Sequence, residues 1–392
     1  MQRPIPEIRD MLATLIATPS ISSVSPQWDQ SNEVVVSQLA QWLSALDFRV
    51  ETMAVPGAPG KYNLIATRGE GPGGLVLSGH TDTVPFDEHR WQTDPFTLSE
   101  RGDRWYGLGT CDMKGFFPLA LEAAWRARDA AFSEPLVILA TADEESAMGG
   151  ARELVRAGRP RGRYAVIGEP TEIRPVRLHK GIMMERLRLE GRSGHSSDPS
   201  LGRNALEGMN AVLTEILALR GELQKQYQHP GFRVDVPTLN PGHIHGGDNP
   251  NRICADCELH FDLRPLPGMD ISELRRLILE RVAPIARARE LECIFEPLFD
   301  GVPPFEQAES SKLVSLCEQM TGHRAEGVAF ATEAPFLQSL GMETLVLGPG
   351  SIDQAHQPDE FLALSQIEPM VGILSGLIQR CCVEPGEERA GD

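Results

Sequence analysis

The sequence predicts an α/β fold: a mostly parallel sheet flanked by helices, with an inserted α+β domain. Short apolar runs, typical of strands buried on both faces, alternate with helical stretches along the chain. A polar, potentially reactive group follows directly after several of these runs. In parallel sheets, functional sites form just beyond the carboxyl ends of the strands, so these groups are expected to lie close together.

The apolar runs and the helices between them define the expected main sheet. The predicted strands are 75–79, 136–140, 164–168 and 344–348. A further run, 106–111, leads into Asp112 and is predicted to be a strand on the same grounds. The predicted helices are 116–130 and 150–157. Strand–helix alternation of this kind indicates parallel pairing.

The pattern changes after Glu169, and this change predicts a separate domain. Residues 183–190 alternate between apolar and polar side chains, as in a strand with one buried face. A helix at 204–223 with one apolar face, a strand at 253–263 and a helix at 271–288 follow. We therefore expect a catalytic domain in two parts, 1–180 and 296–392, interrupted by an inserted domain at 181–295.

Five side chains near the ends of the apolar runs are candidate metal ligands: His80, Asp112, Glu145, Glu169 and His356. Imidazole and carboxylate ligands without thiolates suit Zn²⁺, with Co²⁺ or Mn²⁺ as possible substitutes. Five ligands exceed the needs of one four-coordinate ion that keeps a position open. They suit two ions about 3.5–4 Å apart that share a carboxylate and a bridging hydroxide. Two Zn²⁺ ions balance three carboxylates and one hydroxide.

Glu144 and Asp82 adjoin these ligands. Adjacent carboxylates such as Glu144 and Glu145 raise each other's pKa unless cations offset the repulsion. One of them could bind metal while the other transfers protons. A solvated turn is the alternative for this pair. Asp82 follows His80 by two residues, so it could orient that imidazole, with an ordinary turn residue as the alternative.

Four motifs together resemble the M20 family of dinuclear zinc amidohydrolases and peptidases. They lie at 79–85, 109–115, 143–145 and 168–171. Further segments are similar to the members of this family that deacetylate N2-acetyl-L-ornithine. These segments are 194–199, 246–254, 262–268, 332–335 and 348–360. The resemblance covers nearly the whole chain.

The resemblance implies roles that spacing cannot supply. One zinc ion would be held by His80, Asp112 and Glu169. The other would be held by Asp112, Glu145 and His356, so that Asp112 bridges two ions per subunit. Glu144 would be the general base that activates the bridging water for attack on the acetyl carbonyl.

The resemblance also implies a homodimer formed through the inserted domain. His195, which would otherwise be a surface residue, would be supplied by the partner subunit to the substrate carbonyl, and Asn251 could also reach across the dimer. Arg264 would bind the substrate α-carboxylate, since a guanidinium matches its geometry. Glu333 would bind the distal ammonium. A structural ion pair is the alternative for both charged residues.

Composition excludes several other classes of function. The 392 residues carry a net charge of −18, with 37 Lys and Arg against 55 Asp and Glu. This excess of acid disfavours nucleic-acid binding and favours a cationic small substrate. The first residues lack the apolar core of a signal peptide, and no apolar stretch reaches membrane-spanning length. We therefore expect a cytoplasmic enzyme without a membrane segment.

Two alternatives stay open. The first is a sibling amidohydrolase, such as a succinyl-diaminopimelate desuccinylase, an aminoacylase or a dipeptidase, which would share the metal ligands. The second is a catalytically inactive relative that binds a partner or ligand. Glu144 argues against the second, because a pure binding protein needs no general base. The remaining histidines, including His243, His245 and His260, are expected to be structural.

Overall fold

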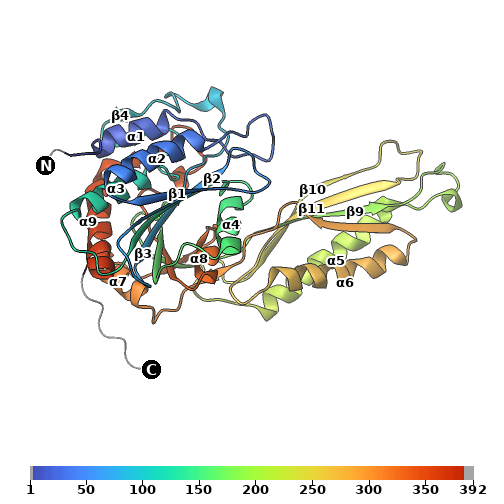
Figure 1. Ribbon diagram of the computed structural model, residues 1–392. Coiled ribbons are helices and arrows are strands. Elements are labelled where there is room, and N and C mark those ends of the chain that lie inside the picture. The colour runs from blue at the N-terminus through green and yellow to red at the C-terminus, as the bar shows by residue number, and fades with distance from the viewer. Residues whose placement is uncertain (1–2, 384–392) are drawn as a thin grey trace. The chain divides into compact units, whose positions relative to one another are not determined.

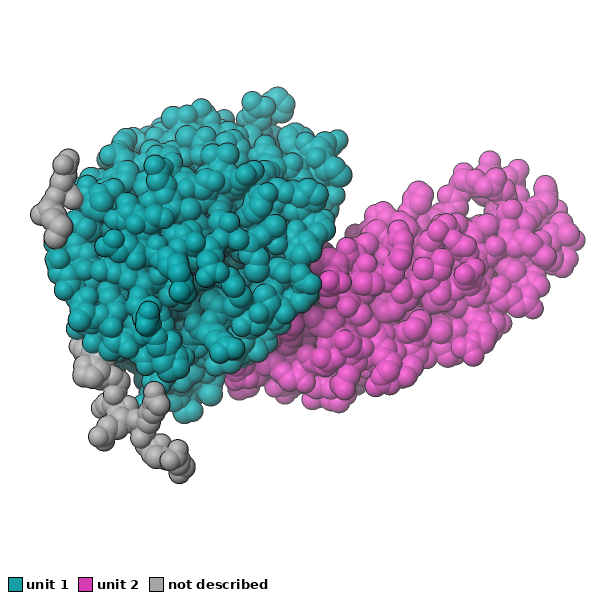
Figure 2. All heavy atoms as spheres, in the orientation of Figure 1, with its two compact units in different colours: residues 1–177, 307–326, 332–392 teal, residues 178–306, 327–331 magenta. Residues whose placement is uncertain are grey.

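A computed structural model describes residues 3–383 of the chain, which fall into two compact units (Figure 2). Within the described residues, unit 1 comprises 3–177, 307–326 and 332–383. Unit 2 comprises Leu178–Glu306 and Gly327–Ala331. No helix in the described part of the chain is both long enough and apolar enough to span a membrane.

Unit 1 contains a mixed sheet with helices on both faces, which confirms the predicted α/β class. Its helices are α1 (Ile8–Ile16), α2 (Glu33–Ala45), α3 (Phe116–Arg126), α4 (Gly149–Ala157), α7 (Lys312–Thr321), α8 (Ala334–Ser339) and α9 (Ile367–Ile378). Its strands are β1 (Arg49–Ala54), β2 (Tyr62–Arg68), β3 (Leu75–His80), β4 (Ser99–Arg101), β5 (Arg104–Tyr106), β6 (Leu136–Thr141), β7 (Tyr164–Ile167), β15 (Glu343–Val346) and β16 (Phe361–Ala363). Two short strands, β8 (Val176–His179) and β14 (Glu326–Val328), run across the unit boundaries.

The main sheet has the order β1-β2-β6-β3-β7-β15, continued by β8. Its four central strands, β6, β3, β7 and β15, run parallel, whereas β1, β2 and β8 pair antiparallel. The strands β3 and β6 are buried along their whole length, as their continuous apolar runs predict. Because the central strands are parallel, their carboxyl-terminal ends all lie at the same end of the sheet.

Helices cover both faces of this sheet (Figure 1). The apolar side chains of α2, α3, α7 and α9 form one continuous core with the strands. Helix α4 packs against α8 on the opposite face. Unit 1 therefore consists of one sheet between two layers of helices, and its apolar side chains are buried between the layers.

The run 106–111 is not a strand, and this prediction is wrong. Only Tyr106 belongs to a strand, β5, which pairs with β4 and β16 in a separate three-stranded sheet. The following residues form a tight loop in which Gly109 has a φ of +86°. The backbone N–H groups of this loop bond to the Glu360 carboxylate instead of a neighbouring strand.

Unit 2 is a four-stranded antiparallel sheet with the order β10-β11-β9-β12 and two helices (Figure 1). Its elements are β9 (Met183–Glu190), α5 (Ala205–Gln226), β10 (Thr238–Gly246), β11 (Asp256–Arg264), α6 (Ile271–Arg287), β12 (Glu292–Pro297) and β13 (Phe305–Glu306). The side chain of Asn204 caps α5, and that of Asp270 caps α6. Both helices lie on the same face of the sheet, so the other face carries polar side chains.

Candidate metal centre

The five candidate ligands come together beyond the carboxyl-terminal ends of the central strands of the main sheet in unit 1. His80 is the last residue of β3, and Glu169 follows β7. Glu145 lies in the turn between β6 and α4, and Asp112 lies in the loop before α3. His356 comes from the loop between β15 and β16. Parallel strands thus bring residues together that are up to 276 positions apart in the sequence.

The ligands form two groups that share Asp112. In the first group, the Nε2 atom of His80 lies 3.1 Å from Asp112 Oδ1 and 3.7 Å from Glu169 Oε1. In the second, the Nε2 atom of His356 lies 3.2 Å from Glu145 Oε2 and 3.6 Å from Asp112 Oδ2. Within each group one potential ligand atom per residue lies within 4.8 Å of the others. The two carboxylate oxygens of Asp112 therefore face different groups.

These ligand sets fit divalent ions of the zinc class. Each group offers one imidazole nitrogen and two carboxylates, which is a donor set that zinc accepts. The Oε1 atom of Glu145 is buried and has no hydrogen-bond partner among residues 3–383. A buried carboxylate oxygen of this kind is costly unless a cation or donor reaches it.

The raised pKa values of the glutamates in this site reflect their burial close to one another. Burial raises the pKa of Glu144 well above its usual value, and the carboxylates of Glu169 and Glu145 raise it further. Burial likewise raises the pKa of Glu169 and of Glu145. The pKa of His356 rises to about 9, chiefly because its imidazole bonds to Glu145. A site with this charge distribution attracts cations.

Asp82 contacts this site in a different way from the one its spacing suggests. The Nδ1 atom of His80 lies 2.9 Å from the backbone carbonyl of Asp82, but 3.7 Å from its carboxylate. The Asp82 carboxylate instead accepts the backbone N–H groups of Glu144, at 3.3 Å, and of Glu145, at 3.1 Å. Asp82 therefore fixes the His80 ring through its main chain and the glutamate turn through its side chain.

Glu144 lies beside both groups. It forms a further cluster with His80 and Glu145, again with potential ligand atoms within 4.8 Å. It is partly buried, whereas His80, Asp112 and Glu169 are almost fully buried. Its side chain is therefore adjacent to candidate ligands of both groups.

Glu333 also belongs to unit 1 and is almost fully buried at the start of α8. Its Oε2 atom accepts a hydrogen bond from the hydroxyl of Thr141 at 2.9 Å. Its Oε1 atom is buried without a hydrogen-bond partner in the described part of the chain. Burial raises the pKa of Glu333 to about 7. One oxygen of this carboxylate is therefore left to pair with a group from outside the described residues.

Three further candidate residues belong to unit 2. His195 is exposed on a loop, with its Nδ1 atom 2.7 Å from the hydroxyl of Ser197. A bridge between His195 and Arg252 brings this loop beside Asn251, which is also exposed. The Nε atom of Arg264 donates to both carboxylate oxygens of Asp262, at 2.9 and 3.0 Å. Arg264 thus forms the ion pair that the sequence left open as an alternative.

Sequence reasoning assigned no role to Glu360, which the structure connects directly to the ligand loop. Its carboxylate is buried and accepts backbone N–H bonds from Gly109 at 3.0 Å, Cys111 at 2.7 Å and Asp112 at 2.9 Å. These bonds hold the loop that presents Asp112. The only signal in the sequence is an acidic residue four positions after His356, which does not identify a partner.

The comparisons with known proteins agree with this geometry. The sequence model of Peptidase family M20/M25/M40 matches residues 76–380. The chain belongs to the M20 family. It is thus a metal-dependent hydrolase of a family of amidohydrolases and peptidases.

The relatives of this M20 chain cover almost its whole length. An acetylornithine deacetylase of Pasteurella multocida is 49% identical over 96% of this chain and 99% of its own length. One of Edwardsiella ictaluri is 50% identical over 97% of this chain and 100% of its own.

Solved structures confirm the M20 fold. An M20 metallo-carboxypeptidase of Sulfolobus solfataricus has a TM-score of 0.76 at 16% identity, covering 96% of this chain and 99% of its own. A dinuclear metal-binding M20 peptidase of Bacillus subtilis, YXEP, has a TM-score of 0.67 at 14% identity, covering 95% of this chain and 97% of its own.

Proposed function

We propose that this chain hydrolyses N2-acetyl-L-ornithine to L-ornithine and acetate, as a cytoplasmic enzyme of arginine biosynthesis. The observation that carries the proposal is the position of Asp112 between two ligand groups, with Glu144 beside them. The relatives named acetylornithine deacetylase, at 49% and 50% identity over nearly the whole chain, support this choice of substrate.

Two metal ions per subunit would be held by the two ligand groups. His80, Asp112 and Glu169 would bind one ion, and Asp112, Glu145 and His356 the other. Zn²⁺ suits these ligands, and Co²⁺ could replace it. Such ions lower the pKa of water toward neutrality and polarise a carbonyl oxygen.

Glu144 would act as the general base. It would take a proton from the attacking water, whose oxygen bonds to the acetyl carbon. It would then give that proton to the α-amine as the carbon–nitrogen bond breaks. The position of Glu144 beside His80 and Glu145 supports this role.

The substrate's charged ends have candidate partners of opposite charge. The unpartnered oxygen of Glu333 would accept the distal ammonium of the ornithine side chain. Asp262 orients the guanidinium of Arg264, so that its terminal nitrogens could bind the α-carboxylate.

The active form would be a homodimer in which unit 2 supplies residues to the partner's site. His195 of the partner would stabilise the negative charge that develops on the acetyl oxygen, and Asn251 would lie beside it. The support for this step is the exposure of both side chains on adjoining loops.

A substrate panel tests the proposed function. Purified, zinc-loaded protein is assayed for release of free amine from N2-acetyl-L-ornithine, N-succinyl-diaminopimelate and several N-acyl amino acids. The proposal predicts the highest kcat/KM for N2-acetyl-L-ornithine. A higher value for another substrate would identify a sibling amidohydrolase, and no hydrolysis of any would indicate an inactive relative.

A further inference from the structure

The open face of the sheet in unit 2 carries a second group of metal-ligating side chains. Along β11, the side chains of Cys257, Leu259 and Phe261 are buried in the core formed with α5 and α6. Successive residues of a strand face opposite sides. Glu258 and His260 therefore lie on the face opposite α5 and α6.

A β-bulge in β10 brings His243 onto the same face. The pairing of β10 with β11 shifts register between Pro241 and His243, so that His243 lies opposite His260 and His245 opposite Glu258. Without the extra residue, Gly242 would face His260, and the side chain of His243 would point toward the helices. The bulge thus aligns histidines of one strand with ligating residues of the next.

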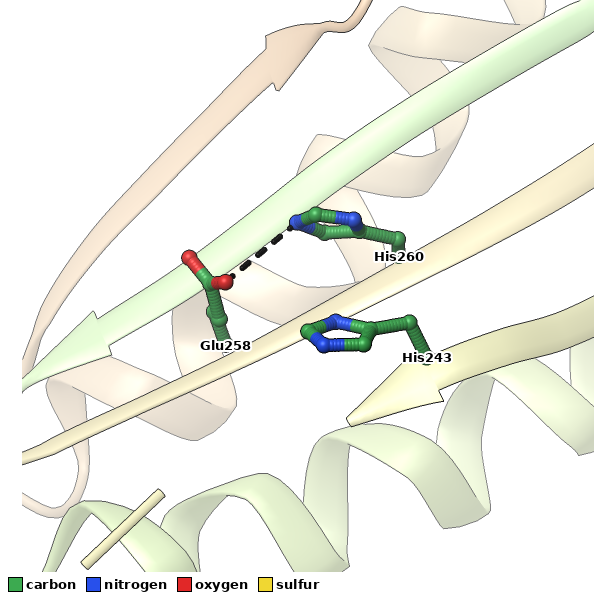
Figure 3. Close-up of side chains that lie close together, drawn as sticks. All are labelled: His243, Glu258 and His260. Atoms are coloured by element: carbon green, nitrogen blue, oxygen red, sulfur yellow. Dashed lines mark ion pairs between the residues drawn. The ribbon is translucent and has the colours of Figure 1, made fainter. Parts of the chain in front are cut away.

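The three side chains converge, as Figure 3 shows. The rings of His243 and His260 have centroids 4.7 Å apart, and the Nε2 atom of His260 lies 3.5 Å from Glu258 Oε1. One potential ligand atom from each residue lies within 4.8 Å of the other two. Side chains grouped in this way could surround a single ion, since zinc binds at about 2.0–2.2 Å from each ligand atom.

Hydrogen bonding within the cluster is incomplete. The Nε2 atom of His260 is buried and forms no hydrogen bond within residues 3–383. The nearby guanidiniums of β9 have other partners on this face: Arg188 bonds to Asp256 at 2.6 Å, and Arg186 bonds to Glu296. Arg188 lies opposite Glu258 in the strand pairing and its charge acts on that carboxylate, but neither arginine forms a hydrogen bond with Glu258 in the described part of the chain.

We propose that His243, Glu258 and His260 bind a divalent transition metal ion of the zinc class in unit 2. Two imidazoles and one carboxylate favour zinc over magnesium or calcium. The ion would join β10 to β11. Because β10 pairs with no other strand of this sheet among the described residues, the ion would fasten an edge strand.

Zinc stoichiometry tests this site. Wild-type protein and single variants are dialysed against Zn²⁺ alone, at a free concentration that saturates the wild type, and bound zinc is measured by elemental analysis. The His243→Ala and Glu258→Gln variants should each bind about one ion fewer per chain than wild type. His89→Ala, which removes an exposed histidine of unit 1, is the matched control and should bind as many ions as wild type.

Equal zinc content in wild type and both site variants would overturn the proposal. The comparison does not depend on the proposed deacetylation, because every protein in it keeps the ligands of unit 1. His243 is exposed and Glu258→Gln preserves side-chain shape, so at least one variant should fold normally.

Hydrogen exchange gives a second, local readout. Added Zn²⁺ should slow amide exchange in β10 and β11 of the wild type, because the ion would link the two strands. It should not slow exchange there in His243→Ala. The same protection in wild type and variant, or none in either, would contradict an ion held by His243.

Discussion

At the scale of single residues, Glu333 is a buried carboxylate that is only partly paired. One of its oxygens is bonded to Thr141, and the other is buried without a partner among the described residues. Burial raises its pKa to about 7, and a cation that approached the carboxylate would lower this pKa and favour the ionised form. The ammonium of the proposed substrate is such a cation.

The variant Glu333→Gln tests this pairing. It removes the negative charge but keeps the shape of the side chain. Hydrogen bonds to charged groups contribute about 1.5–3 kcal/mol, so kcat/KM for N2-acetyl-L-ornithine should fall about 10- to 150-fold. Steady-state kinetics of the zinc-loaded protein measure the change.

N2-acetyl-L-norvaline is the control substrate, because it lacks only the distal ammonium. Glu333→Gln should leave its kcat/KM unchanged or higher. An equal loss for both substrates would show that Glu333 has a structural role instead.

At the scale of elements, continuous apolar runs predicted the central strands. A strand that is buried on both faces has apolar side chains at nearly every position, and this pattern is visible in the sequence. The same signal failed at 106–111. Those residues are apolar and mostly buried, but their backbone groups bond to the side chain of Glu360 from another part of the chain. An apolar pattern in the sequence indicates which side chains are buried. It does not indicate which distant group accepts the hydrogen bonds of the backbone N–H groups.

The grouping of the candidate metal ligands was predictable for a similar reason, and the contact made by Asp82 was not. Polar residues that follow neighbouring parallel strands lie at the same end of the sheet. His80 and Glu145 are close together for this reason. Whether Asp82 bonds through its carbonyl or its carboxylate depends on local turn geometry. The spacing of two residues from His80 allows either.

Glu360 leads to a prediction about pH. Burial raises its pKa from 4.5 to about 8. Between these values the folded chain holds a proton that the unfolded chain has lost, so the free energy of unfolding falls as pH rises. The pKa values of His80 and Glu169 are also raised and act in the same direction, whereas that of Asp112 is lowered and acts against it.

The urea midpoint of metal-stripped protein should therefore fall between about pH 5 and pH 8. In Glu360→Gln, which cannot ionise, the decline should be shallower. Zinc-loaded protein is the control, because metal binding favours the deprotonated ligands and should reduce the decline. A midpoint of the metal-stripped wild type that rises across this range would contradict the assignment.

At the scale of the whole molecule, the proposed homodimer would combine residues of two subunits in each active site. The candidate metal ligands belong to unit 1, and His195 belongs to unit 2. If His195 acts on the partner's site, two inactive homodimers should complement each other. His195→Ala and Glu144→Gln homodimers should each be nearly inactive.

A heterodimer of these two variants has one site with both defects and one site with neither. It should therefore recover about half of the wild-type activity. Co-expression with two different affinity tags allows its purification and assay. No recovered activity in the pure heterodimer would show that His195 does not serve the partner's site.

The central claim is that Glu144 transfers protons beside two metal ions, and the variant Glu144→Gln tests it most directly. The measurement is kcat for N2-acetyl-L-ornithine, with zinc content determined on the same samples. The account predicts unchanged zinc in unit 1 and a kcat about 10²- to 10⁴-fold below wild type, because an amide cannot accept the proton of water. A kcat near that of wild type at full zinc content would contradict it.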